Sequence, residues 1–381
     1  MASNSKNLAE LLNSDVTLTA TDIANGAVTT DKLDSATKAS LGGGNKNLII
    51  NGAMNIAQRA TSSTGLGGTS GYYTADRWEH QFNGTSGRLT SSVVGITDLA
   101  GFRSALKFDC TTADTSIATT EYFVLAHKME GFNIQSVGFG TASAKPLTLS
   151  FYAKANGNAT YIAQLQTGGS NEVSASFNVT SSWQRFEINY PAATNVGSVL
   201  NNDTSAQLNL QIWLVAGATY SGGSSLNTTW GSPNNNTMAV GVGNFFGNTS
   251  NEFFITGVQL ETGTAATDFE HRSVADELAL CQRYFYMFES KAFDMHFDYH
   301  VVNATSEYKQ GGISFPVEMR STPSSTGNAT ALTTSNCESG GPAQMTVMSR
   351  NHASFVSRSA STGRMYLYTN TGYKNSFSAE L

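Results

Sequence analysis

The sequence predicts an all-β fold in which two β-rich regions are joined by one short helix. Charged residues make up only 13% of the 381 residues, about half the usual quarter, while Gly is frequent at 36 and Pro is scarce at 6. This composition is typical of many short strands joined by polar turns. Several segments also alternate apolar and polar residues with a period of two, which places one side of a strand in a core. The chain is long enough for two or three domains.

The first segment, Met1–Asn45, has too few large apolar residues to bury a core alone. Small apolar residues recur along it at Val16, Leu18, Ile23, Ala27, Val28 and Leu33. One interpretation is a disordered tail. We favour an oligomerisation segment that folds only on a partner or between identical chains, because nothing in the same segment covers these residues. Three parallel copies would bury them and leave no exposed strand edge, so we expect a homotrimer, although the sequence alone would also allow a dimer or a hexamer.

The region 46–270 is predicted to be a β-sandwich. Three of its segments place large apolar residues on alternate positions, which marks the core side of each strand. These residues are Leu147, Leu149, Phe151 and Ala153, then Phe186, Ile188 and Tyr190, then Leu208, Leu210, Ile212 and Leu214. Loops rich in Gly, Asn, Ser and Thr separate the segments, as expected for two packed sheets.

The junction Phe253–Phe288 contains the clearest helix signal in the chain. A closing strand comes first, with Phe254, Thr256, Val258 and Leu260 expected on one side. Ser273 is a suitable N-cap and Asp276 follows three residues later. An apolar helix face is predicted from Val274, Leu278, Cys281 and Phe285. The region 271–381 is therefore interpreted as this helix followed by a small β-sandwich.

Charge and cysteine content exclude several classes of function. The net charge is −6 and no Lys/Arg run occurs, so we expect no nucleic-acid-binding face. The three cysteines, Cys110, Cys281 and Cys337, lack metal-type spacing, and Cys281 is expected to be a small core residue. The start has no signal-peptide pattern and no apolar run is long enough to span a bilayer. We expect a soluble product made in the cytoplasm, no membrane insertion and no cofactor.

No enzyme motif is found. The sequence contains no G-x-S-x-G elbow, no Gly-rich phosphate loop before a helix and no H-E-x-x-H pair. No catalytic residue is therefore assigned, and the chain is predicted not to be an enzyme.

Several motifs resemble those of bacteriophage tail-fibre and virion structural proteins. The junction carries GVQLETG, ATDFEHR and ELALCQRYF in order, and NLIINGAMNIAQR with YTADRWEH stands upstream. DIANGAVTTDKL resembles repeats of fibre shafts, while FPVEMR with STP and the SFSAEL ending resemble C-terminal fibre modules. The resemblance implies a virion location in the tail, attachment to other tail proteins through the N-terminal segment, and three-fold assembly.

A second resemblance concerns the sandwich. The ordered segments NGAM, ALKF, LTLSFYAKA, WQRFEI and ITGVQLE resemble carbohydrate-binding jelly rolls. The resemblance implies recognition of host-surface glycan, either polysaccharide or lipopolysaccharide. Two other functions remain open: a purely structural virion component, such as a tail adaptor or head fibre, and a depolymerising tailspike enzyme.

The first candidate sugar platform is Trp213, which shares a strand face with Asn209 and Gln211. If Tyr161–Thr167 is a strand, Gln164 and Gln166 form a similar polar face. Flat aromatic rings stack on the C–H groups of a pyranose, and amides bond its hydroxyls. The alternative is a half-buried Trp covered by a loop or a neighbouring subunit.

Two further features have a functional and a structural interpretation. Trp230 lies in a polar loop, where it either binds glycan or anchors the loop to the core. Asp294, His296, Asp298 and His300 share one face of a predicted strand. That face either holds a metal ion or is simply solvated, and we assign no metal, because metal sites usually draw ligands from several elements.

Overall fold

The computed structural model describes residues 46–168, 171–194, 196–197, 199–290, 296–301, 308–327, 332–335, 345–347, 349–358, 363–369 and 373–381. The predicted attachment segment, Met1–Asn45, lies outside the described residues. From Asn45 onward the chain forms one compact unit. No helix among the described residues is long and apolar enough to cross a membrane.

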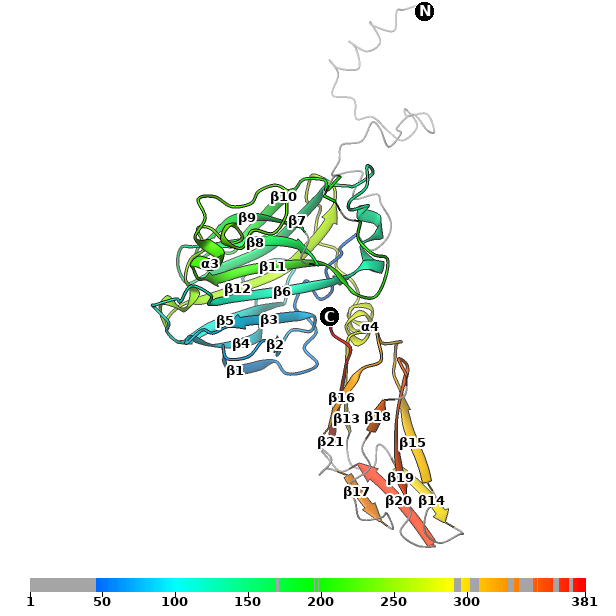
Figure 1. Ribbon diagram of the computed structural model, residues 1–381. Coiled ribbons are helices and arrows are strands. Elements are labelled where there is room, and N and C mark those ends of the chain that lie inside the picture. Colours follow the sequence, from blue (N-terminus) through cyan, green and yellow to red (C-terminus); the bar gives the residue numbers. More distant parts are fainter. Residues whose placement is uncertain are drawn as a thin grey trace, which may run out of the picture. The chain divides into compact units, whose positions relative to one another are not determined.

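The first twelve strands form two antiparallel six-stranded sheets (Figure 1). Sheet A has the order β1-β4-β5-β12-β7-β10, and sheet B the order β2-β3-β6-β11-β8-β9. The strands are β1 (Ser62–Leu66), β2 (Gly71–Tyr72), β3 (Trp78–Asn83), β4 (Arg88–Gly95), β5 (Ser104–Thr112), β6 (Tyr122–Glu130), β7 (Leu147–Ala155), β8 (Ala159–Thr167), β9 (Asn171–Val179), β10 (Gln184–Tyr190), β11 (Ala206–Ala216) and β12 (Glu252–Thr262).

The pairing of β5 to β12 is that of a jelly roll. The first of these eight strands pairs with the last, β5 with β12, and the pairs β6–β11, β7–β10 and β8–β9 follow inward. A long hairpin wrapped onto itself gives this nested order, which places four of the eight strands in each sheet. The predicted all-β jelly-roll sandwich is confirmed.

The core lies between the two sheets and consists of aliphatic and aromatic side chains. The predicted core faces of β7, β10 and β11 all contribute to it, which confirms these three alternations. Its largest fully buried aromatic side chains from the sandwich strands and the 217–251 connection include Tyr190, Phe108, Phe123, Phe151, Phe245, Phe246 and Phe253. Trp78 is also fully buried and donates its indole N–H to the Asn51 carbonyl, 3.1 Å away.

The prediction for β12 is wrong over half of the strand, because a bulge shifts its alternation. Before the bulge the core-facing residues are Phe253 and Ile255. After it they are Val258 and Leu260. Gly257 lies in the bulge with φ 61°, in the left-handed region that favours glycine. Phe254 is consequently on the opposite side of the sheet from Val258.

The predicted helix is α4 (Val274–Gln282), and its N-cap is confirmed. The Ser273 hydroxyl accepts the Asp276 backbone N–H at 3.1 Å. The predicted apolar face is only partly correct, because Val274 is 66% exposed while Leu278 is half-buried and Cys281 is fully buried. The helix is short, so only its second half reaches the core.

Side chains from α4 and the residues after it contact the sandwich. Arg283 forms a bidentate ion pair with Glu130, with N···O distances of 2.9 and 2.8 Å, and the Tyr284 hydroxyl also donates to this carboxylate. Arg77 is fully buried and pairs with Glu380.

The strands after α4 form three antiparallel three-stranded sheets, β13-β21-β16, β14-β20-β17 and β15-β19-β18. They are β13 (Phe285–Ser290), β14 (His296–Val301), β15 (Tyr308–Ser314), β16 (Ser324–Gly327), β17 (Leu332–Ser335), β18 (Met345–Val347), β19 (His352–Arg358), β20 (Gly363–Thr369) and β21 (Tyr373–Ser378). This agrees with the predicted small C-terminal β region. The short helices are η2 (Gly131–Asn133), η3 (Gln135–Val137), α3 (Ala218–Ser221), η4 (Asn235–Thr237) and η5 (Phe245–Gly247).

Candidate functional site

The outer face of sheet B carries a small hollow, which we call the sheet B hollow. Its volume is about 180 Å³. It is lined by Gln81, Tyr122, Val124, Gln166, Gln211, Trp213, Tyr220, Asn235 and Met238. These residues come from β3, β6, β8 and β11 and from the segment that follows β11. The lining includes two of the residues that the sequence analysis assigned to a sugar site, Gln211 and Trp213.

Residues 217–243, which we call the strap, cross the outer face of sheet B and carry α3 (Figure 1). Backbone bonds fasten the strap to β8 and β9, from Ser174 N–H to the Asn227 carbonyl at 2.7 Å and from Gly243 N–H to the Thr160 carbonyl at 2.7 Å. The Ser174 hydroxyl adds a bond to the Met238 carbonyl at 3.0 Å. The strap therefore belongs to the folded sandwich and shapes the hollow.

Trp213 is largely covered, with only 4% of its surface exposed. Its ring packs against Tyr220 of the strap at 5.4 Å and Tyr122 of β6 at 5.8 Å, and these two tyrosines meet edge to face at 5.3 Å. The covering loop is the structural interpretation that the sequence analysis left open. A sugar in the hollow would meet the edge of this aromatic cluster rather than an open indole face.

A buried carboxylate fixes the orientation of the amide beside Trp213. The Gln164 side chain donates to Glu172 at 3.2 Å, and its carbonyl oxygen accepts the Trp213 indole N–H at 3.0 Å. Burial raises the pKa of Glu172 from its ordinary value, and the bonds from Asn234 and Asn227 counteract this rise. Because Gln164 is fully buried, it positions Trp213 and does not itself face the hollow.

Two glutamines leave complementary groups available to a ligand. Gln211 donates one N–H to the carbonyl oxygen of Gln166 at 3.3 Å. The side-chain carbonyl of Gln211 therefore remains as an acceptor, and the amide NH2 of Gln166 remains as a donor next to it. Burial raises the pKa of the Tyr122 hydroxyl, so it stays protonated and also able to donate. The hollow thus combines aromatic edges with uncharged hydrogen-bonding groups.

The other two predicted site residues lie elsewhere. Asn209 is on the same strand face, opposite Gln166, but its carbonyl oxygen is buried without a hydrogen-bond partner and the side chain does not line the hollow. Trp230 packs edge to face on Phe139 at 4.9 Å and donates its indole N–H to the Pro191 carbonyl at 2.7 Å. Trp230 is thereby fastened to the core, in agreement with its interpretation as a loop anchor.

Sequence reasoning missed most of the residues that line the hollow. Tyr122 and Gln81 stand on alternating strands whose polar side could have been identified from the sequence. Tyr220 and Asn235 belong to the strap, and no periodic pattern predicts which loop residue reaches a sheet. Among the described residues no group of three or more His, Cys, Asp or Glu could hold a metal ion. Of the strand considered for metal, Asp294 lies outside the described residues, as do the side chains from His296 to His300.

Comparison with known proteins identifies similar folds only among solved structures. No family model matches the chain, and no curated protein matches it. A family 61 carbohydrate-binding module in complex with β-1,4-galactotriose is 10% identical, with a TM-score of 0.31 over 57% of this chain and 99% of that chain. A putative sugar-binding protein from Bacteroides thetaiotaomicron is 14% identical, with a TM-score of 0.31 over 57% and 100%. The enzymatically active domain of a tailspike protein of bacteriophage CBA120 is 8% identical, with a TM-score of 0.29 over 57% and 22%.

These structural neighbours include carbohydrate-binding modules with jelly-roll domains. Because the identities and TM-scores are low, the function is argued below from the residues of this chain.

Proposed function

We propose that this chain is a non-enzymatic glycan-binding protein of a bacteriophage virion, a tail fibre or receptor-binding protein. The observation that supports glycan binding best is the sheet B hollow, where an aromatic cluster lies beside an unpaired amide donor and acceptor. Aromatic groups contact the C–H faces of a sugar, while amides bond its hydroxyls. The lining residues are uncharged, which suits a neutral sugar unit.

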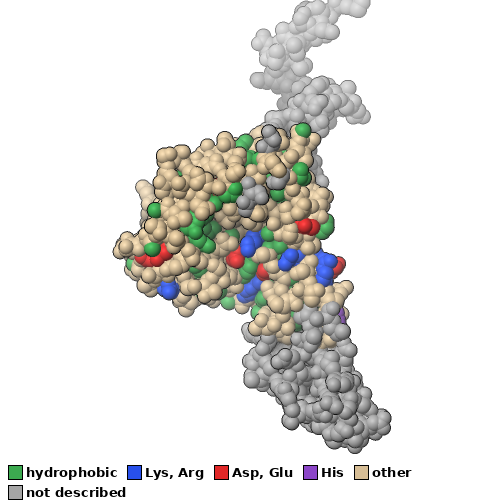
Figure 2. All heavy atoms as spheres, viewed as in Figure 1, with side chains coloured by type: hydrophobic (Ala, Val, Ile, Leu, Met, Phe, Trp, Pro, Cys, Tyr) green, Lys and Arg blue, Asp and Glu red, His purple; other side chains and the backbone are tan. Residues whose placement is uncertain are grey.

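The surface around the hollow also supports a neutral ligand. Figure 2 shows that most atoms on this side of the sandwich belong to the backbone or to uncharged polar side chains, with a few scattered charges. Among the charged side chains of sheet B, Lys128 pairs with Glu79 at 2.9 Å. Binding dominated by hydrogen bonds and ring contacts depends only weakly on salt, whereas binding between exposed charges is screened.

The virion location rests on the motif resemblance of the junction and of the N-terminal segment. In this proposal Met1–Asn45 joins other tail proteins, three chains assemble into a homotrimer, and the jelly roll faces the host. The alternative of a purely structural component predicts the same assembly without glycan binding. The depolymerising tailspike predicts cleavage of the glycan that is bound.

Gln211→Ala and Tyr220→Ala test the proposed site. Both residues are only partly buried, so these variants should fold normally, whereas the covered Trp213 is a poor test because its removal would leave a cavity. The full-length protein is applied to a printed array of bacterial surface polysaccharides and lipopolysaccharides. Loss of one hydrogen bond should weaken binding by about 3- to 10-fold.

The matched control is Gln184→Ala, which removes an exposed glutamine from the edge strand β10 of sheet A. It should bind like the unaltered protein. Absence of binding to every glycan on the array would favour the structural component. Equal binding by Gln211→Ala and the control would exclude the sheet B hollow as the site. New reducing ends in the bound polysaccharides would indicate the enzyme.

A further inference from the structure

A second and larger pocket lies at one end of the sandwich, and we call it the asparagine pocket. Its volume is about 670 Å³. The turn between β7 and β8, the end of β9, and the residues before β12 form its walls. It is lined by Ala155, Asn156, Gly157, Asn158, Ala159, Thr160, Tyr161, Asn178, Val179, Thr180, Gly241, Gly243, Asn244 and Asn251. The sequence analysis did not single out any of these residues.

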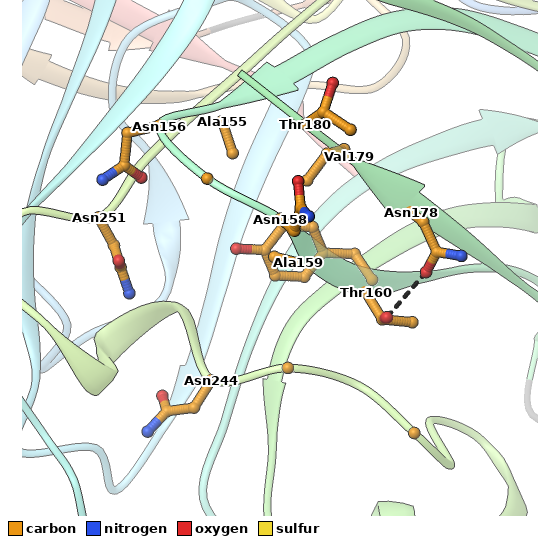
Figure 3. Close-up of a pocket in the computed structure, with 14 residues that line it drawn as sticks. Ala155, Asn156, Asn158, Ala159, Thr160, Asn178, Val179, Thr180, Asn244 and Asn251 are labelled. Atoms are coloured by element: carbon orange, nitrogen blue, oxygen red, sulfur yellow. Dashed lines mark hydrogen bonds between the residues drawn. The ribbon is translucent and has the colours of Figure 1, made fainter. Parts of the chain in front are cut away.

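Figure 3 shows the five asparagine side chains around the opening, with Asn156, Asn251 and Asn244 along one side and Asn158 and Asn178 along the other. Three of them are held by the backbone. Asn156 donates to the Ser250 carbonyl at 2.6 Å, Asn244 to the Asp114 carbonyl at 2.8 Å and Asn251 to the Phe245 carbonyl at 2.9 Å. One wall is therefore preorganised, which lowers the entropic cost of binding.

The opposite wall retains free hydrogen-bonding capacity. Asn178 accepts the Thr160 hydroxyl at 2.8 Å, which orients its amide and leaves both N–H groups unused (Figure 3). Asn158 is exposed, and no hydrogen bond ties its side chain to the described part of the chain. The carbonyl oxygen of Asn251 is likewise available as an acceptor, because its bond to Phe245 uses an N–H. Donors and acceptors thus stand on both sides of one opening.

Apolar residues also line the pocket. Ala155, Val179 and Tyr161 are nearly fully buried, at 6%, 0% and 2% exposure, so they offer a ligand little surface. Gly157 and Gly241 border open space, because a Cβ added at either position would meet no atom within 4 Å. The lining contains no charged residue. A pocket lined by amides and without charge is complementary to a molecule with many hydroxyls and no charge.

We propose that the asparagine pocket is a second binding site, specific for uncharged oligosaccharide and independent of the sheet B hollow. The two sites have no lining residue in common. One chain would then hold a glycan at two points. Two linked weak sites bind a long polymer more tightly than either site alone, without any additional contact.

The test uses saturation-transfer difference NMR on the full-length protein. The probes are neutral tetrasaccharides of glucose, galactose and mannose, with trigalacturonate as a charged probe. We expect at least one neutral probe to bind at about millimolar affinity and trigalacturonate not to bind. Asn158→Ala and Asn178→Asp should each lower the binding affinity for the neutral probe at least threefold. Asn178→Asp keeps the acceptor for Thr160 but removes the two free N–H donors.

The matched control is Asn201→Asp, an exposed asparagine in the loop before β11. The strand registers place this loop at the end of the sandwich opposite to the pocket. Asn158→Ala and Asn178→Asp are also made in the Gln211→Ala background, where a further weakening of at least threefold assigns the loss to the asparagine pocket and not to the hollow. The proposal would be overturned by an absence of signal from every neutral probe, by equal binding of trigalacturonate, or by equal weakening in Asn201→Asp.

Discussion

Replacing Glu380 should strongly destabilise the protein, because its carboxylate neutralises a fully buried arginine. Arg77 has no exposed surface and pairs with Glu380. It also donates to the Lys128 carbonyl at 2.6 Å and lies 3.5 Å over the ring of Tyr284. A second arginine, Arg59, reaches the same carboxylate at 3.0 Å. Removing this carboxylate would leave a buried guanidinium without its counter-charge.

Breaking a buried ion pair from one side costs about 3–5 kcal/mol of unfolding free energy. Glu380→Gln should lie near 3 kcal/mol, because its amide oxygen still accepts one hydrogen bond from Arg77. Glu380→Ala, which removes the acceptor as well, should approach 5 kcal/mol by the same principle. The double variant Arg77→Met, Glu380→Leu should recover most of the loss, since it leaves no buried charge unpaired.

These free energies are measured by urea unfolding, monitored by tryptophan fluorescence. The slope of unfolding free energy against urea concentration should be the same in every variant. The matched control is Glu318→Gln, which breaks the ion pair with Arg350 at 3.2 Å. These side chains are 57% and 39% exposed. An exposed pair contributes about 0–1 kcal/mol. If Glu380→Gln costs no more than Glu318→Gln, the charge on Arg77 is not compensated by Glu380 and the reasoning is wrong.

Two other predictions concern pH and assembly. Burial raises the pKa of Asp76 from 3.8 to about 6, against the opposing effects of Arg59 and Gln58. The pKa of Asp76 is higher in the folded state than in the unfolded state, so its protonated form stabilises the fold. This contribution is fully present below about pH 4, and about 3 kcal/mol of unfolding free energy is lost as the pH rises to 6. Asp76→Asn should make the melting temperature less dependent on pH between pH 4 and 6. An unchanged pH dependence would contradict the raised pKa of Asp76. Sedimentation equilibrium of the full-length protein at micromolar concentration should give one species near three times 40.4 kDa, whereas a species of one chain mass would exclude the trimer.

Regular alternation made the fold predictable. Leu208, Leu210 and Ile212 had to share one side of a strand, and all three are fully buried between the sheets. The same rule failed at Gly257, because one extra residue in a bulge reverses every side chain that follows. A glycine in a strand signals such a possibility, but the sequence does not say whether the partner strand accommodates it.

The site was less predictable, because it depends on a loop. The polar face of Gln211 and Trp213 was visible in the sequence, and the structure indeed places both residues at one hollow. The strap that covers Trp213 has no periodic pattern, and its position is set by bonds to Ser174 and Thr160 on distant strands. Burial of a tryptophan by a loop is a tertiary property, which local sequence cannot specify.

The connection between β11 and β12 contributes residues to both proposed binding sites. It contributes Tyr220, Asn235 and Met238 to the sheet B hollow, and Gly241, Gly243, Asn244 and Asn251 to the asparagine pocket. The strands that it joins lie in the interior of their sheets, each paired on both sides. Phe245 and Phe246 of this connection are core residues, so only its exposed lining residues can vary with little cost to the core. Changes in this one segment would therefore alter glycan specificity at both sites together, while changes in the turn between β7 and β8 would alter only the asparagine pocket.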